Sequence, residues 1–86
     1  MLLDLRGSGP LYRRVCDAIR ENIRTGRWPG GMRLPGTRTL ARDLGVSRIV
    51  TVAAYEQLAA EGYLVSARGS GSRVVEQVAD RIALEV

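Results

Sequence analysis

The chain has 86 residues, a formal net charge of +4 and a pI near 10.2. This length suits one small domain with a modest core, and a hydrophobic content of 45% is too high for a disordered tail. No apolar run approaches the roughly 20 residues that a membrane span requires.

The first nine residues are expected to form a loose arm that ends in Gly7-Ser8-Gly9. They lack the basic region and the long apolar stretch of a secretory signal, so no such signal is expected. A helix is then expected to open at Pro10 and to stop at Gly26. At about 100° per residue, its apolar side comprises Leu11, Tyr12, Val15, Cys16, Ile19 and Ile23. Its charged side is interpreted as a solvated face with local ion pairs, in preference to a phosphate-binding face.

Cys16 is the only cysteine, so no internal disulfide can form, which fits a reducing cytoplasm. Because it lies on the apolar side of the first expected helix, we predict a small buried core residue in preference to a reactive thiol.

Residues 27–36 are rich in glycine and proline and are expected to form a loop. Within it, residues 32–34 are expected to add a short strand beside a later hairpin, and Trp28 is expected to cover the edge of the core.

The next segment predicts a helix, a tight turn and a second helix. Thr37 is a plausible N-cap for a helix that ends near Leu44. Gly45 permits the positive φ that ends a helix abruptly, and Ser47 can cap the following helix, expected over about residues 48–61.

Two short strands are expected over residues 63–68 and 72–75, joined by a glycine-rich turn. The fold class is therefore mainly α with a small β hairpin: a winged helix-turn-helix of three helices and a two- or three-stranded wing, over residues 10–75. Residues 76–86 carry three acids against one arginine, and we expect a linker or a dimer-contact helix there.

The third expected helix has two faces. Packing on the first two helices is expected for Val50, Thr51, Ala54, Tyr55, Leu58 and Glu61. The outward side is expected to hold Arg48, Ile49, Val52, Ala53 and Glu56, and its N-terminal part is where such a helix meets base edges in the DNA major groove.

Four residues are the main candidates for DNA contact on this arrangement. Arg48 is placed to contact a base edge or a phosphate, and the Ser47 hydroxyl with the free N–H groups of the first turn can bind a phosphate. Arg38 should reach the neighbouring backbone. Arg68, beside Gly69 at the tip of the hairpin, is placed to enter the minor groove, where arginine is favoured.

Ile49 and Val52 are also candidate DNA-binding residues, although they are branched apolar groups on a face expected to be polar. Contact with thymine methyl groups is one explanation. Packing against another part of the molecule, or simple exposure, explains them equally well.

An ordered series of motifs resembles the N-terminal domain of the GntR family over about residues 10–75. The residues that carry it are Pro10-Leu11-Tyr12, Leu34-Pro35, Arg38, Leu40-Ala41, Leu44-Gly45-Val46-Ser47-Arg48, Ala54-Tyr55-Glu56-Gln57-Leu58, Glu61-Gly62-Tyr63-Leu64 and Gly69-Ser70-Gly71. The Ala-Tyr-Glu-Gln-Leu and Ala-Glu-Gly-Tyr-Leu pieces are most similar to the MocR branch.

The resemblance implies a bacterial transcription regulator that binds a double-stranded DNA operator as a homodimer. It places DNA-contacting positions at Arg38, Ser47, Arg48, Arg68 and Gly69. Members of the MocR branch carry a C-terminal aminotransferase-like domain that binds pyridoxal phosphate through a lysine, and this chain has no lysine. No cofactor is therefore expected in the chain itself.

One departure from the family pattern concerns base recognition. The family usually has polar residues directly after the Ser-Arg pair, whereas this chain has Ile49 and Val50. The resemblance therefore predicts the class of partner better than the DNA sequence that is bound.

Three other functions are alternatives to a sequence-specific DNA-binding regulator. An enzyme is disfavoured, with no catalytic or metal-binding residues expected, because the chain has no histidine, no lysine and no metal-ligand cluster. The second alternative is a winged-helix protein–protein interaction module, and the third is a non-specific DNA-binding domain.

All 13 basic residues are arginine, which suits phosphates and guanine edges, although codon bias in a GC-rich genome explains that composition equally well.

Overall fold

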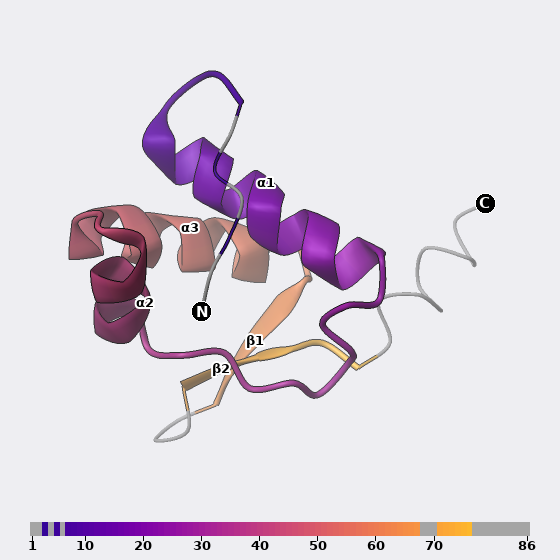
Figure 1. The fold of residues 1–86 in the computed structure, drawn as a ribbon. Helices are drawn as coiled ribbons and strands as arrows, with labels where there is room; N and C mark the ends of the chain where they lie inside the picture. The colour runs from indigo at the N-terminus through magenta and orange to yellow at the C-terminus, as the bar shows by residue number, and fades with distance from the viewer. Residues whose placement is uncertain (1–2, 4, 6, 68–70, 77–86) are drawn as a thin grey trace.

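The computed structural model describes residues 3, 5, 7–67 and 71–76. Its elements follow the order α1 (Leu11–Arg24), α2 (Thr37–Leu44), α3 (Arg48–Ala60), β1 (Leu64–Ala67) and β2 (Gly71–Val74). In Figure 1 the three helices lie on one side of the hairpin that the strands form. This confirms the predicted winged helix-turn-helix. Much of the expected arm, and residues 77–86 of the expected linker, lie outside the described residues.

Helix α1 buries its apolar stripe as predicted. Val15, Cys16, Ile19 and Ile23 are all buried. Tyr12 is an exception, because it is 37% exposed beside a hollow between α1 and the end of α3. A tyrosine at such an edge can keep its ring against the protein and its hydroxyl in water.

The turn between α2 and α3 depends on Gly45. Its φ of +69° is left-handed, a conformation that glycine adopts without steric cost. The N–H groups of Gly45 and Val46 donate to the carbonyl oxygens of Arg42 and Ala41, at 3.3 and 3.0 Å. This is a Schellman arrangement, and it satisfies the last carbonyls of α2 while turning the chain sharply.

The N-cap of α2 differs from the prediction. Gly36, in an extended conformation, occupies the cap position, and Thr37 is the first helical residue. A Thr37 side chain already inside the helix cannot make the bond that an N-cap residue makes. The predicted start was therefore wrong by one residue.

Helix α3 packs on α1, on α2 and on β1. It ends at Ala60, and Glu61 is the C-cap residue, so the predicted end was one residue too late. Gly62, with a φ of +88°, then turns the chain into β1.

The strands pair antiparallel, with Leu64 opposite Val74 and Ala67 opposite Gly71. Each limit differs by one residue from the predicted one, because backbone pairing sets the ends of a strand. The expected third strand is a single bridge between Arg33 and Arg73. Within the described part of the chain, no helix is long and apolar enough to cross a membrane.

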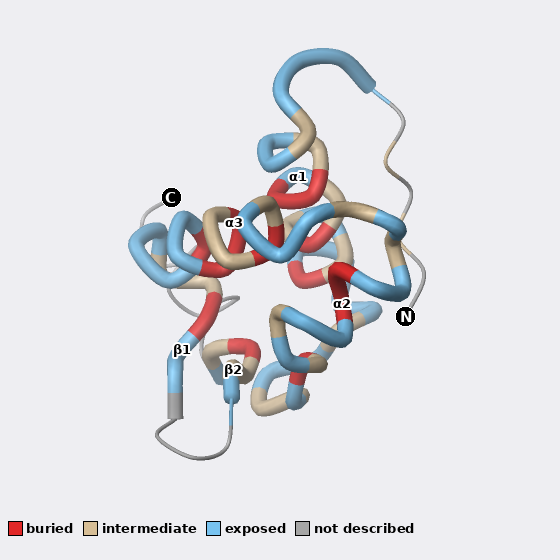
Figure 2. Tube along the Cα trace, turned by 90° about the vertical axis from the view of Figure 1, so that its left-hand side faces the viewer, coloured by how far each residue is buried: buried red, intermediate tan, exposed pale blue. Residues whose placement is uncertain are grey.

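The core lies where the three helices and the hairpin meet. Figure 2 shows the buried segments of α1 and α3 facing the interior and exposed segments on the outside. Trp28 is half-buried and packs against the edge of this cluster, as predicted. The buried apolar residues of the cluster are Val15, Cys16, Ile19, Ile23, Leu34, Leu40, Ala54, Tyr55, Leu58, Leu64 and Val74.

Candidate nucleic-acid interface

The inner face of α3 is fixed to the domain by apolar packing. Thr51, Ala54 and Leu58 are completely buried, and Tyr55 is 7% exposed. The four residues follow the i, i+3, i+4, i+7 spacing that places side chains on one face of a helix. The predicted inner face is thus confirmed at these positions, while Val50 is half-buried.

Two hydrogen bonds attach the same face to the chain around the start of α2. The Thr51 hydroxyl donates to the carbonyl oxygen of Thr37 at 2.8 Å. The Tyr55 hydroxyl donates to the carbonyl oxygen of Pro35 at 2.6 Å. Burial raises the pKa of Tyr55, so this hydroxyl keeps its proton in the folded domain. The beginnings of α2 and α3 are therefore held side by side.

An ion-paired cluster connects α1 to the end of α3. Arg20 donates from Nη2 and Nε to Oε1 of Glu61, at 2.7 and 3.0 Å, and from Nη1 to Asp17 at 2.7 Å. A hydrogen bond from Gln57, together with Arg20, lowers the pKa of Glu61. The charged side of α1 is thus engaged in ion pairs, as predicted, and Glu61 contributes to packing through Arg20 although it is exposed.

Cys16 is 2% exposed, and its thiol donates to the carbonyl oxygen of Ala54 at 3.5 Å. Burial raises the pKa of the thiol. This burial confirms the prediction that Cys16 is a core residue.

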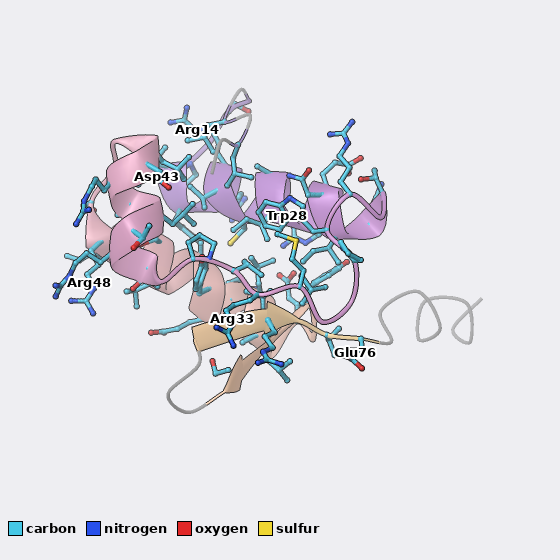
Figure 3. All side chains as sticks on the ribbon, turned by 60° about the horizontal axis from the view of Figure 1, so that its bottom comes forward. Arg14, Trp28, Arg33, Asp43, Arg48 and Glu76 are labelled. Atoms are coloured by element: carbon cyan, nitrogen blue, oxygen red, sulfur yellow. The ribbon has the colours of Figure 1, made fainter. Side chains whose placement is uncertain are left out.

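The outer face of α3 has a different character. Arg48 and Glu56 are exposed, Ile49 is 80% exposed, and Val52 and Ala53 are half-buried. These five side chains line one shallow depression along the helix. Figure 3 shows Arg48 pointing away from the domain at the N-terminal end of this face. The outward set predicted from the helical projection is therefore confirmed.

The candidate residues Arg38 and Ser47 are also exposed. Arg38 is the second residue of α2, and Ser47 occupies the N-cap position of α3 without a side-chain capping bond. Because the starts of the two helices are held together, Arg38, Ser47 and Arg48 share one end of the domain. Arg68 and Gly69 lie outside the described residues, so their position in the wing stays a prediction.

Residues of the hairpin that the sequence did not single out extend this surface. Ser66 and Ser72 face each other across the strands and line a groove with Thr37, Val52 and Tyr55 of the helices. Arg33, in the loop before α2, forms an isolated antiparallel bridge with Arg73 of β2, whose buried Nε has no hydrogen-bond partner in the described part of the chain. Alternation along the strands could have suggested both pairs, but only with the register known.

Comparisons with known proteins agree with this geometry. The family model described as "Bacterial regulatory proteins, gntR family" matches residues 11–74. The probable rhizopine catabolism regulatory protein MocR of Rhizobium meliloti is 39% identical over 82 residues, which cover 95% of this chain and 17% of that protein. The pyridoxine biosynthesis transcriptional regulator PdxR of Corynebacterium glutamicum is 46% identical over 61 residues, which cover 71% of this chain and 14% of that protein.

Solved structures are similar over nearly the whole chain. YtrA from Sulfolobus acidocaldarius, a GntR-family transcription factor, has a TM-score of 0.78 and 31% identity, with 98% of this chain and 88% of that chain covered. AraR(DBD) in complex with operator ORE1 has a TM-score of 0.74 and 27% identity, with 87% of this chain and 94% of that chain covered.

Proposed function

We propose that this chain, which belongs to the GntR family of bacterial regulatory proteins, binds operator DNA with the outer face of α3 in the major groove. Its relatives are transcription regulators, so the domain is a DNA-binding regulatory module and not an enzyme. One observation carries the proposed orientation: α3 is attached to the domain by one face only, and Arg48 stands at the start of the other.

The starts of α2 and α3 supply the polar contacts in this proposal. Arg48 reaches a base edge or an adjacent phosphate. The exposed Ser47 hydroxyl and the N–H groups of the first turn of α3 bind a phosphate oxygen, since the helix dipole favours an anion there. Arg38 contacts the neighbouring phosphate. The structure of AraR(DBD) in complex with operator ORE1 supports DNA binding by this domain, because that chain has a similar fold.

The hairpin supplies the second contact region. Arg68 and Gly69, at its turn, are proposed to reach the minor groove. The groove between α3 and the hairpin has the hydroxyls of Thr37, Ser66 and Ser72 on its walls, and these can donate to phosphate oxygens.

From the resemblance to the MocR branch we also propose three properties of the full regulator. It works in the cytoplasm, it binds its operator as a homodimer, and it has an aminotransferase-like domain for pyridoxal phosphate. This chain has no lysine, so its residues do not fit covalent attachment of that cofactor. A full-length regulator that stays monomeric on the operator, or that gains no cofactor absorbance with pyridoxal phosphate, would contradict the corresponding proposal.

Fluorescence anisotropy tests the function. A preferred duplex is first selected from a random library with the chain, and the chain is then titrated against it and a scrambled duplex at several salt concentrations. We expect tighter binding to the selected duplex at every salt concentration, with an affinity that falls as salt rises because phosphates are neutralised. Equal affinity for both duplexes would favour a non-specific DNA-binding domain, and no binding would favour a protein-interaction module.

A further inference from the structure

The outer face of α3 carries an apolar stripe that its role in folding does not explain. Val52 and Ala53 follow Ile49 at spacings of three and four residues, so both lie on the same side of the helix as Ile49. Ile49 is 80% exposed, and with Arg48 and Glu56 the three residues line one shallow depression. Val52 and Ala53 are half-buried, whereas Ile49 is left largely in water by the described part of the chain.

The sequence at the start of α3, which includes Ile49 and Val52, is unfavourable for an isolated helix. Residues 49–52 form a run of four β-branched side chains, which lose rotamer freedom in a helix and have lower helix propensity than alanine or leucine. An isoleucine left in water also gains none of the free energy that its burial would supply. A requirement of folding alone would favour other residues at position 49.

The surroundings of the stripe identify the kind of group that would cover it. Arg48 lies beside Ile49, and Arg38 lies at the adjoining start of α2, so a polyanion is attracted to this end of the domain. Among the base-pair edges in the major groove, the thymine C5-methyl group is the apolar one. A β-branched side chain in a helix is held almost entirely in one rotamer, so little freedom is lost when it contacts such a methyl group.

We propose that Ile49, with Val52 and Ala53 beside it, recognises thymine methyl groups in the operator. This inference rests on the proposed function and adds a specificity to it. The polar side chains at the helix start position α3 on the phosphates, and the apolar stripe selects thymine at the base pairs beneath it. The domain thus reads part of its site by apolar contact.

Deoxyuridine provides the test, because it keeps the hydrogen-bonding edge of thymine and lacks only the methyl group. Each thymine of the selected duplex is replaced singly by deoxyuridine, and binding of the chain is measured by anisotropy. We expect at least one replacement to weaken binding about fourfold, the value for one buried methylene-sized group. Ile49→Ala should bind the thymine duplex more weakly and should lose its sensitivity to that replacement.

Val65→Ala is the matched control, since Val65 is another exposed aliphatic residue, 51% exposed, but lies on β1. It should keep the full response to deoxyuridine. If wild type binds every deoxyuridine duplex as tightly as the thymine duplex, or Ile49→Ala keeps the wild-type ratio, thymine recognition by Ile49 is overturned while operator binding stands. If no duplex is preferred at all, the proposed function and this inference both fail.

Discussion

The inner and outer faces of α3 differ in what they contact, although they alternate along the same 13 residues. Inner side chains are buried and bonded: Leu58 is completely enclosed, and Tyr55 and Thr51 donate to backbone oxygens that precede or begin α2. Outer side chains such as Arg48 and Ile49 are exposed. The inner face determines where the helix lies, and the outer face is available to determine what it binds.

This division has a mechanical consequence. Because the inner bonds run to the chain around the start of α2, a change in the position of α3 should also move Arg38 and Ser47, the residues proposed to bind phosphates. Substitutions on the outer face have no such effect. Stability and DNA recognition should therefore be separable by the side of α3 that is altered.

The largest effect is expected from a cavity on the inner face. Leu58→Ala should lower the free energy of unfolding by about 2–5 kcal/mol, because the lost methyl groups leave a space that the packed neighbours fill only in part. Urea denaturation measures this change. Ile49→Ala on the outer face is the control and should alter the free energy of unfolding by less than about 0.5 kcal/mol. Equal losses for the two variants would contradict the claim that only the inner face of α3 stabilises the fold.

The next effect concerns binding. Arg48→Ala should weaken binding to the selected duplex by about 1–3 kcal/mol if the side chain contacts a base, with the free energy of unfolding unchanged. Arg24→Ala removes the same charge from the last turn of α1 and should change affinity little. The same loss for Arg48→Ala on selected and scrambled duplexes would make Arg48 a phosphate contact instead.

A smaller effect is expected at the hydroxyl of Tyr55. Tyr55→Phe removes its bond to the carbonyl oxygen of Pro35 and should cost about 1 kcal/mol of stability at neutral pH. Because burial raises the pKa of Tyr55 in the folded state, the unfolded chain loses this proton first, and wild-type stability should fall as the pH rises above about 10.

Denaturation from pH 7 to 11 measures the alkaline dependence. Tyr55→Phe should show a shallower decline than wild type, with the remainder coming from the buried Cys16 thiol, whose pKa burial also raises. Tyr12→Phe, at the edge of α1, should keep the full decline. An identical alkaline decline in wild type and Tyr55→Phe would show that the buried hydroxyl is not its source.

The smallest effect is expected where α3 ends. Glu61→Gln weakens the bonds from Arg20 and should cost about 0.5–1 kcal/mol near pH 7. The pKa of Glu61 is lowered in the folded state, so this contribution is present above the unfolded pKa of about 4.3 and is lost as the pH falls through the folded value. Glu21→Gln is the matched control and should lose less stability, since the pair of Glu21 with Arg24 is more than half exposed. An equal loss of stability in both variants would show that the bonds from Arg20 to Glu61 stabilise the domain no more than that exposed pair.

Most of the helical architecture could be predicted from the sequence. The apolar spacing that includes Cys16 and Ile19 has a helical period, and the glycines at 45 and 62 end helices because they adopt positive φ. Arg48, Ser47 and Arg38 were identified as exposed candidates for the same local reason. The exact limits of the helices are harder to predict from the sequence, since the cap at Gly36 depends on the backbone conformation of the loop before it.

The sequence by itself therefore determined the order of the elements, the two faces of α3 and the family, because helical periodicity and turn residues act over a few positions. Tertiary structure alone decided how these parts are joined. Tyr55 bonds to a residue 20 positions away, and Arg20 reaches a partner 41 positions along the chain. The pairing of Arg33 with Arg73 likewise required the strand register. Such contacts depend on how the elements pack in three dimensions, which no local pattern specifies.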